Sequence, residues 1–237
     1  MEKTFLTISI MLVPIMFAVV CHEVAHGFVA WRFGDPTARM LGRLTLNPIK
    51  HIDIIGTIAV PVFLVLSHSG ILFGWAKPVP VTFENLRNPK RDMIWVSAAG
   101  PITNFVIAIV SALLLRSIVA LGNPAFLEFS KITFIEPIIL MLAASVYFNL
   151  LLAIFNMIPL PPLDGGHVLM GLLPQRQAYA FAKLEKHGFL ILIALLFILP
   201  SLLGIDIFRL IIYPILYTGI FVLAGPQAGL VLGAMHL

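Results

Sequence analysis

The stretch VVCHEVAHGFVAW, residues 19–31, places His22, Glu23 and His26 inside an otherwise apolar run. That run extends over residues 4–30, which is long enough for a helix to cross a bilayer. An ionisable side chain at bilayer depth is energetically costly, and it usually faces a cavity or a metal. The stretch therefore predicts a membrane helix that carries a functional site.

The composition places the whole chain in a membrane. Of its 237 residues, 60% are hydrophobic and only 11% are charged, whereas a soluble domain carries about 25% charged residues. So much apolar surface excludes a water-soluble globule and indicates a polytopic membrane protein. The net charge of +4 is modest and the cations lie between apolar runs, which is not the pattern of a nucleic-acid-binding surface. The single cysteine, Cys21, excludes an intrachain disulfide.

Five long apolar runs and one weaker run predict the membrane topology. The long runs are residues 4–30, 93–121, 133–158, 188–203 and 207–223. Most of the Lys and Arg lie in three loops, at residues 31–53, 73–92 and 159–187. The positive-inside rule assigns all three loops to the cytoplasm. The first two loops share a side only if the weaker run, 54–72, does not cross, so we expect a re-entrant segment there. An ordinary sixth span stays the alternative.

Two short segments have the character of strands. Residues 37–50 show partial alternation, and the prolines of residues 74–83 hold that segment extended, as in an edge strand. We therefore predict an all-α polytopic membrane protein of about five to six transmembrane helices, with a three-helix catalytic core, a re-entrant segment and a small β element near the cytoplasmic face. The whole chain is expected to be one transmembrane domain, with a catalytic core over about 1–187 and an accessory C-terminal helical hairpin over about 188–223.

The pattern His22-Glu23-x-x-His26 indicates a zinc site. Residues four apart on a helix project from one face, so the two imidazoles can bind one Zn²⁺ ion. Glu23 lies beside them, where it can act as a general base. A polar helix face that other helices satisfy is the alternative for this pattern.

A catalytic zinc takes three protein ligands and keeps one position open, and Asp164 is the candidate for the third ligand. It follows a helix end broken by prolines, in the stretch NMIPLPPLDGG at 156–166. With 93–121 as the single return span, the helices 4–30 and 133–158 run in the same direction, so their C-terminal ends lie at one face. Taken alone, Asp164 would be interpreted as a turn carboxylate.

Three blocks of the chain resemble the site-2 protease family of intramembrane zinc metalloproteases, in a short form without a PDZ or CBS insertion. The blocks are HEVAHG at 22–27, AGPITN at 99–104 and NMIPLPPLDGGH at 156–167. The resemblance implies a multi-pass protein of the cell (plasma) membrane that hydrolyses peptide bonds in or near transmembrane segments. Its active site would lie toward the cytoplasmic side, and its partners would be substrate helices and the lipid bilayer. The oligomeric state stays open.

The resemblance also implies roles for single residues. The cofactor would be Zn²⁺, with Glu23 as the general base, and the zinc ligands would be His22, His26 and Asp164. Asn156 would face the scissile carbonyl, as an oxyanion donor or substrate clamp. A helix–helix hydrogen bond is the alternative for this asparagine.

Three further histidines are open to two interpretations each, and one asparagine is given a single one. His167 is a candidate donor to Asp164, because metal-binding carboxylates are usually supported in this way, or else an ordinary loop histidine. Asn104 is interpreted as a residue of close helix packing. For His51 and His68, a role near the site and a role at a helix interface both remain.

Two other classes of function use the same residues. A metal-ion transporter would use the His, Glu and Asp side chains as a transit site, although the halves of the chain show no symmetry. A non-catalytic membrane scaffold would keep the metal for stability alone. Glu23 favours the hydrolase, because a scaffold has no need of a general base.

Overall fold

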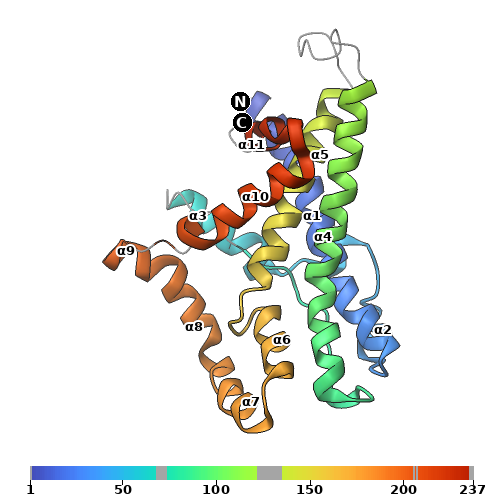
Figure 1. Cartoon of the computed structure of the whole chain (residues 1–237), viewed down its shortest axis with the longest axis vertical. Coiled ribbons are helices and arrows are strands. Elements are labelled where there is room, and N and C mark those ends of the chain that lie inside the picture. The colour runs from blue at the N-terminus through green and yellow to red at the C-terminus, as the bar shows by residue number, and fades with distance from the viewer. Residues whose placement is uncertain (1, 68–73, 122–134, 205, 207, 235–237) are drawn as a thin grey trace.

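The computed structural model describes residues 2–67, 74–121, 135–204, 206 and 208–234, and all regular structure within them is helical (Figure 1). The α-helices are α1 (Glu2–Arg32), α2 (Thr37–Met40), α3 (Val60–Leu66), α4 (Pro89–Leu121), α5 (Ile135–Asn156), α6 (Asp164–Leu172), α7 (Gln175–Ala182), α8 (Gly188–Ile193), α9 (Leu199–Leu203), α10 (Tyr213–Ala224) and α11 (Ala228–Gly233).

In the described part of the chain, five helical stretches are long and apolar enough to cross a membrane. They are Ile10–Arg32, Pro89–Leu121, Ile135–Asn156, Gln175–Leu203 and Phe208–Gly233. Each contains most of one of the five long apolar runs. The predicted helical, multi-pass architecture is therefore confirmed.

Helices α1, α4 and α5 pack against one another at the centre of the molecule (Figure 1). Fully buried small residues, including Ala108 and Ala112 on α4 and Ala143 on α5, let the helices approach closely. In Figure 1, α1 and α5 run in one direction and α4 runs in the other. The C-terminal ends of α1 and α5 consequently lie toward the same end of the bundle, as the topology argument requires.

The C-terminal helices form two arms of different character. The stretch from α8 to α9 leans away from the three central helices (Figure 1) and ends at Gly204, which has a left-handed φ of 66°. Helix α10 then returns and packs against α5 through the buried side chains Leu216 and Ile220. The first arm is therefore exposed along much of its length, whereas the second belongs to the core.

In its described part, residues 54–67, the weaker apolar run 54–72 fits neither interpretation given to it. Its described part is a π-helical turn, Ile54–Ala59, that continues into α3. This helix is shorter than the about 20 residues that a span requires, and the structure does not support the predicted re-entrant segment. Trp75 donates its backbone N–H to the Gly56 carbonyl at 3.1 Å, so the chain returns to the start of the run.

The predicted β element is also wrong, because the described residues contain no strand. Residues 37–50 contain α2 and most of a 3₁₀ turn, Pro48–His51. Residues 74–82, called the strap below, are extended but unpaired with any strand. Pro78 and Pro80 remove N–H groups from one edge of the strap. The N–H groups of the other edge donate to scattered acceptors, namely the carbonyls of Gly56 and His51 and the carboxylate of Glu23.

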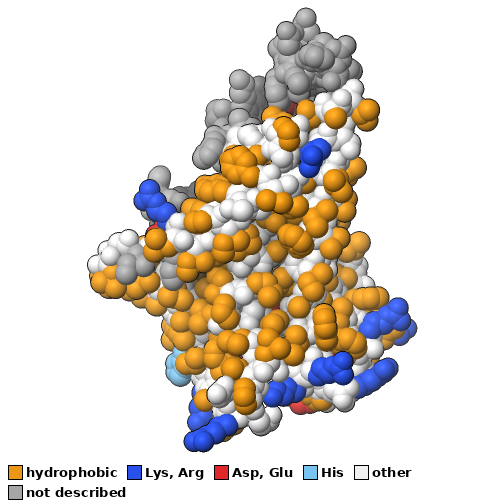
Figure 2. All heavy atoms as spheres, in the orientation of Figure 1, with side chains coloured by type: hydrophobic (Ala, Val, Ile, Leu, Met, Phe, Trp, Pro, Cys, Tyr) orange, Lys and Arg blue, Asp and Glu red, His pale blue; other side chains and the backbone are white. Residues whose placement is uncertain are grey.

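The surface separates apolar from basic side chains. Figure 2 shows a broad hydrophobic face over the helices, with most of the visible Lys and Arg gathered at the end where α2, α7 and the start of α4 lie. This distribution is typical of a membrane protein whose cations sit at one bilayer surface.

Candidate metal centre

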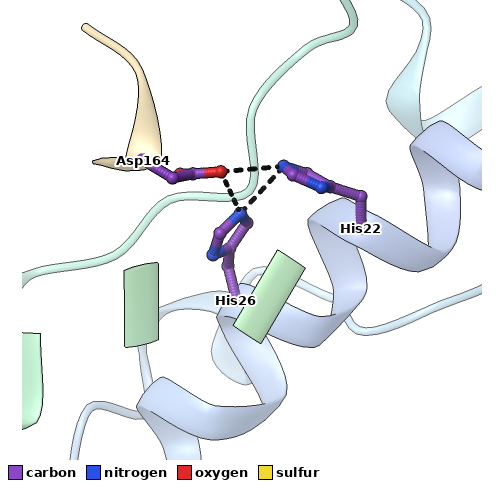
Figure 3. Close-up of side chains that lie close together, drawn as sticks. All are labelled: His22, His26 and Asp164. Carbon is purple, nitrogen blue, oxygen red and sulfur yellow. Dashed lines mark hydrogen bonds and ion pairs between the residues drawn. The ribbon is translucent and has the colours of Figure 1, made fainter. Parts of the chain in front are cut away.

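Two histidines of α1 and one aspartate of α6 meet at a single point (Figure 3). His22 and His26 project from the same face of α1, and their Nε2 atoms lie 3.0 Å apart. Oδ2 of Asp164 lies 3.1 Å from Nε2 of His22 and 3.3 Å from Nε2 of His26. The structure thus brings together the three side chains that the sequence analysis singles out as metal ligands.

The turn between α5 and α6 delivers Asp164 to the histidines. Leu163 donates its N–H to the carbonyl of Leu160 at 2.9 Å, and Asp164 opens α6 directly after this turn. Gly165 lies so close to the end of α5 that a Cβ there would stand 2.4 Å from the carbonyl oxygen of Met157. Only glycine therefore lets α6 approach closely enough to place the carboxylate.

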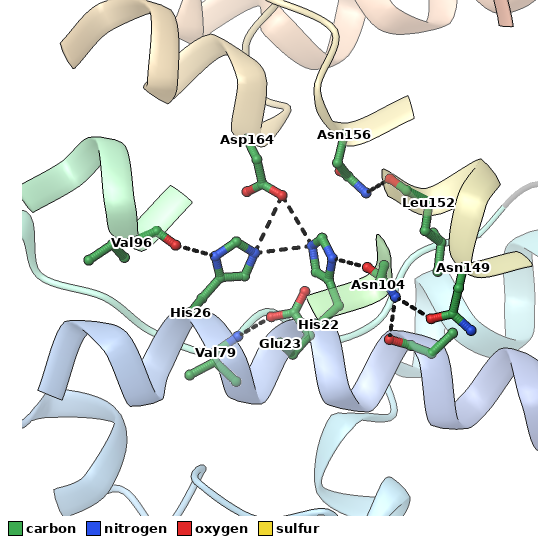
Figure 4. A network of polar contacts seen from close by, with 11 residues as sticks. His22, Glu23, His26, Val79, Val96, Asn104, Asn149, Leu152, Asn156 and Asp164 are labelled. Carbon is green, nitrogen blue, oxygen red and sulfur yellow. Dashed lines mark hydrogen bonds and ion pairs between the residues drawn. The ribbon is translucent and has the colours of Figure 1, made fainter. Parts of the chain in front are cut away.

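The tautomer of His26 follows from its second contact. Its Nδ1 lies 2.7 Å from the backbone carbonyl of Val96 on α4 (Figure 4). A carbonyl oxygen can only accept a hydrogen bond, so Nδ1 carries the proton. A neutral imidazole protonated on Nδ1 presents an unprotonated Nε2, and this Nε2 is the atom that faces Asp164.

The tautomer of His22 is set in the same way, through an amide. Nδ1 of His22 lies 2.6 Å from Oδ1 of Asn104 on α4. The amide orientation of Asn104 is unambiguous, because its Nδ2 donates to the backbone carbonyl of Ala18 at 3.1 Å and to Oδ1 of Asn149 at 2.8 Å. His22 therefore donates from Nδ1 and also turns an unprotonated Nε2 toward the common point (Figure 4).

This donor set fits a divalent cation. Two unprotonated imidazole nitrogens and a carboxylate oxygen converge, and Oδ2 of Asp164 is buried with no hydrogen-bond partner. Three acceptors facing one another need a positive charge between them. Two histidines and one carboxylate are the protein ligands of many catalytic zinc sites, which keep a fourth position open. The residues present therefore fit Zn²⁺.

A cavity of about 600 Å³ adjoins the metal centre. Its polar lining includes His22, Glu23 and Asn156, and its apolar lining includes Trp75 of the strap and Phe189 of α8. The two aromatic rings pack edge to face, with their centroids 5.7 Å apart. The metal centre thus opens into a mostly apolar chamber between α1, α5, α8 and the strap.

Glu23 and Asn156 line this cavity from opposite helices (Figure 4). Oε2 of Glu23 accepts the backbone N–H of Val79 in the strap at 2.7 Å. Nδ2 of Asn156 donates to the carbonyl of Leu152, one turn earlier on its own helix, at 3.0 Å. Within the described residues, no recorded hydrogen bond joins Asn156 to another helix.

The remaining predicted residues lie elsewhere. His167 pairs with Glu185, at 3.5 Å from Nε2 to Oε1, and packs against the ring of Phe83; the described contacts include none with Asp164. His51 is buried, and its Nε2 lies 2.8 Å from the carbonyl of Thr45. His68 lies outside the described residues.

The sequence analysis missed the support that α4 gives to both histidines. Asn104, interpreted there as a packing residue, is completely buried and contacts His22, a candidate metal ligand. An asparagine inside a spanning helix is itself a signal of function, because an unpaired amide is costly in a bilayer. The Val96 carbonyl carries no such signal, since every residue has a backbone oxygen.

Comparisons with known proteins point the same way as the geometry. Residues 117–199 match the model of peptidase family M50. YwhC of Bacillus subtilis, named as a zinc metalloprotease, is 36% identical over 190 residues, which cover 80% of each chain. Rip2 of Mycolicibacterium smegmatis, also named as a zinc metalloprotease, is 33% identical over 188 residues, which cover 79% of this chain and 66% of Rip2.

A more distant relative is archaeal. The zinc metalloprotease MJ0392 of Methanocaldococcus jannaschii is 25% identical over 213 residues, which cover 89% of this chain and 48% of the relative. The chain thus spans about half the length of MJ0392 and about two thirds of Rip2. No solved structure gives a significant match.

Proposed function

The chain belongs to peptidase family M50, the site-2 proteases, which are zinc metalloproteases, and from that premise we propose that it hydrolyses peptide bonds in or near the transmembrane segments of other membrane proteins. One observation carries this proposal: His22, His26 and Asp164 converge inside a bundle of membrane-spanning helices, beside a cavity that is also lined by a carboxylate outside this set of three. Membership of a protease family favours the hydrolase over the transporter and the scaffold.

We propose that His22, His26 and Asp164 hold the zinc ion. When bound, zinc acts as a Lewis acid that polarises the scissile carbonyl and makes water more acidic. The Nδ1 contacts to Asn104 and Val96 keep both imidazoles in the tautomer that binds metal. The protein therefore fixes the ligand directions before the ion arrives.

Glu23 is the proposed general base. The Val79 N–H holds Oε2 of Glu23, which leaves the other carboxylate oxygen to take a proton from the attacking water. The same carboxylate then returns the proton to the leaving amine. Asn156 is the proposed oxyanion donor: turned from Leu152 into the cavity, its Nδ2 would donate to the carbonyl oxygen as negative charge develops there.

The cavity indicates how the substrate is presented. Its lining is mostly apolar, which suits the side chains of a membrane-spanning helix, and a peptide bond must leave the helix before water can attack it. We propose that a locally unwound substrate segment lies in the chamber between the strap and α5. The proposed topology puts the basic end of the molecule (Figure 2), and the site near it, toward the cytoplasm in the plasma membrane.

The test is cleavage of model membrane helices by the purified full-length protein. Native protein with zinc is expected to cut a subset of the helices, and Glu23→Gln is expected to lower the rate by about 10²–10⁴-fold while zinc content stays the same. Glu136→Gln, the same change at the start of α5, is the matched control and is expected to keep native activity. Cleavage by Glu23→Gln at the native rate would refute the proposed base.

A further inference from the structure

A second cavity, of about 580 Å³, lies beside the strap and outside the metal centre. It is lined by Leu41, Arg43, Asp53, Lys77, Pro78 and Pro80. Pro78 also lines the metal-site cavity, so the two cavities adjoin at the strap. The second cavity contains none of the proposed metal ligands, and the proposed reaction does not use it.

The position of Arg43 is fixed by the way α2 ends. Gly42 adopts a left-handed φ of 61°, its N–H donates to the carbonyl of Arg39 at 3.0 Å, and the N–H of Arg43 donates to the carbonyl of Ala38 at 2.9 Å. This pair of hydrogen bonds is a Schellman motif. The guanidinium of Arg43 then reaches the strap, where Nη2 donates to the Lys77 carbonyl at 2.9 Å.

The cations of this cavity lack counter-ions. Nε of Arg43 is buried and has no hydrogen-bond partner. Neither Arg43 nor Lys77 has a carboxylate within 4.0 Å, because no ion pair in the described residues involves a Lys or an Arg. A guanidinium presents its donors as a planar fork that matches carboxylate and phosphate oxygens. The cavity therefore presents to an oxyanion two cations without counter-ions in the described structure.

Asp53 is the one acidic side chain in the lining, and it is already engaged. Its Oδ1 accepts the backbone N–H groups of Ile55 at 3.0 Å and Gly56 at 2.7 Å, at the start of the π-helical turn. A carboxylate in this position is stabilised by the helix end that it caps. The lining thus combines two cations with one carboxylate that already caps a helix end.

The rim of the cavity identifies the source of the oxyanion. Leu41 is 63% exposed, and Ile54 and Ile55, which follow Asp53, are 77% and 63% exposed. A soluble phosphate gains no binding energy from exposed apolar side chains. A phospholipid, in contrast, places its phosphate directly next to apolar chains. We propose that Arg43 and Lys77 bind the headgroup phosphate of an anionic phospholipid, whose acyl chains pack on this exposed apolar surface.

The test measures lipid binding and leaves proteolysis aside. Purified full-length protein is placed in phosphatidylcholine nanodiscs that contain a minor fraction of phosphatidylglycerol, and the lipid that stays with the released protein is quantified by native mass spectrometry. Native protein is expected to retain phosphatidylglycerol selectively. Arg43→Gln and Lys77→Gln are each expected to lower that retention about fivefold, the factor that corresponds to about 1 kcal/mol per cation.

The matched control is Arg91→Gln, which removes the same charge from an exposed site at the start of α4. It is expected to leave retention unchanged. Equal losses in all three variants would show attraction by net charge alone and would overturn the proposed site, as would no loss in either Arg43→Gln or Lys77→Gln. Full displacement of the lipid by inorganic phosphate would also overturn the proposal, because the site would then bind a free anion. None of these results depends on cleavage activity, so the protease proposal is tested separately.

Discussion

Oδ1 of Asn104 lies 2.6 Å from Nδ1 of His22, and this contact joins α4 to α1 at the metal centre. The amide cannot turn away, because its Nδ2 is held by the carbonyl of Ala18 and by Oδ1 of Asn149 on α5. All three central helices, α1, α4 and α5, therefore determine the direction in which the His22 imidazole points.

Replacement of Asn104 should accordingly weaken metal binding. Asn104→Leu removes the acceptor, frees the His22 ring to rotate, and is expected to lower zinc affinity by about 10–100-fold. Asn104→Asp keeps an acceptor for Nδ1 and is expected to lose less. A competition titration with a chromophoric chelator measures the zinc affinity of both variants. Thr218→Ala on α10, where the hydroxyl donates to the Pro214 carbonyl of its own helix at 2.8 Å, serves as the control. A native zinc affinity in folded Asn104→Leu would contradict the prediction.

Gly100 gives a second test of the same site. A Cβ at this position of α4 would lie 2.3 Å from Nε2 of His26, closer than real Cβ contacts, so Gly100→Ala should displace the imidazole and deplete the purified protein of zinc. The change adds only one methyl group and should not disturb helix formation. Gly229→Ala, where a Cβ meets nothing within 4 Å, should keep native zinc content. Elemental analysis measures the zinc content of both variants. Native zinc content in Gly100→Ala would contradict the prediction.

The three candidate metal ligands were predictable from the sequence because their chemistry is local. His22 and His26 lie one helical turn apart, and Asp164 follows a helix end that nearby prolines indicate. The contacts that orient those ligands were not predictable in the same way. They join α1 to α4 across a long stretch of sequence, and one of them uses a backbone carbonyl, which has no signature in the sequence.

The errors in the fold prediction have a common origin in the segment between α1 and α4. Pro78 and Pro80 indicated an extended backbone correctly, but extension does not make a strand without a partner edge. In the structure the edge that keeps its N–H groups binds side chains and isolated carbonyls. The run 54–72 has the hydropathy of a membrane segment, yet the helix within its described part ends by Leu66.

Asp35 links the loop after α1 to the strap and to the residues that follow it, and its contacts predict a dependence of stability on pH. The side chain is fully buried. Its oxygens accept the N–H of Thr82 at 2.8 Å, Nδ2 of Asn85 at 3.0 Å and the N–H of Thr37 at 3.1 Å. Burial raises the pKa of Asp35, but the hydrogen bonds from Thr37, Asn85 and Thr82 outweigh it and lower the pKa overall.

Because the folded-state pKa of Asp35 lies below its ordinary value of about 4, its stabilising effect is complete above that pH and is lost as the pH falls through the folded-state pKa. Asp35→Asn is expected to destabilise the protein at pH 7 by about 1.5–3 kcal/mol and to flatten the acid side of its stability profile. The apparent Tm in detergent, recorded from pH 7 to pH 3, measures both effects. Glu84→Gln, at an exposed carboxylate nearby, should change neither.

Asn156 can be separated from the metal ligands by the kind of defect it produces. If its Nδ2 donates to the carbonyl oxygen only as negative charge develops, Asn156→Ala should lower kcat by about 10²–10³-fold and leave KM almost unchanged. Zinc content should stay native, because Asn156 lines the cavity without contacting a ligand in the described structure. Its present bond is to Leu152 within α5, and one such bond at a helix end contributes only about 1 kcal/mol to stability. A substrate clamp would instead raise KM, and a structural role would lower the apparent Tm, so the split between kcat, KM and Tm in this one variant distinguishes the three roles.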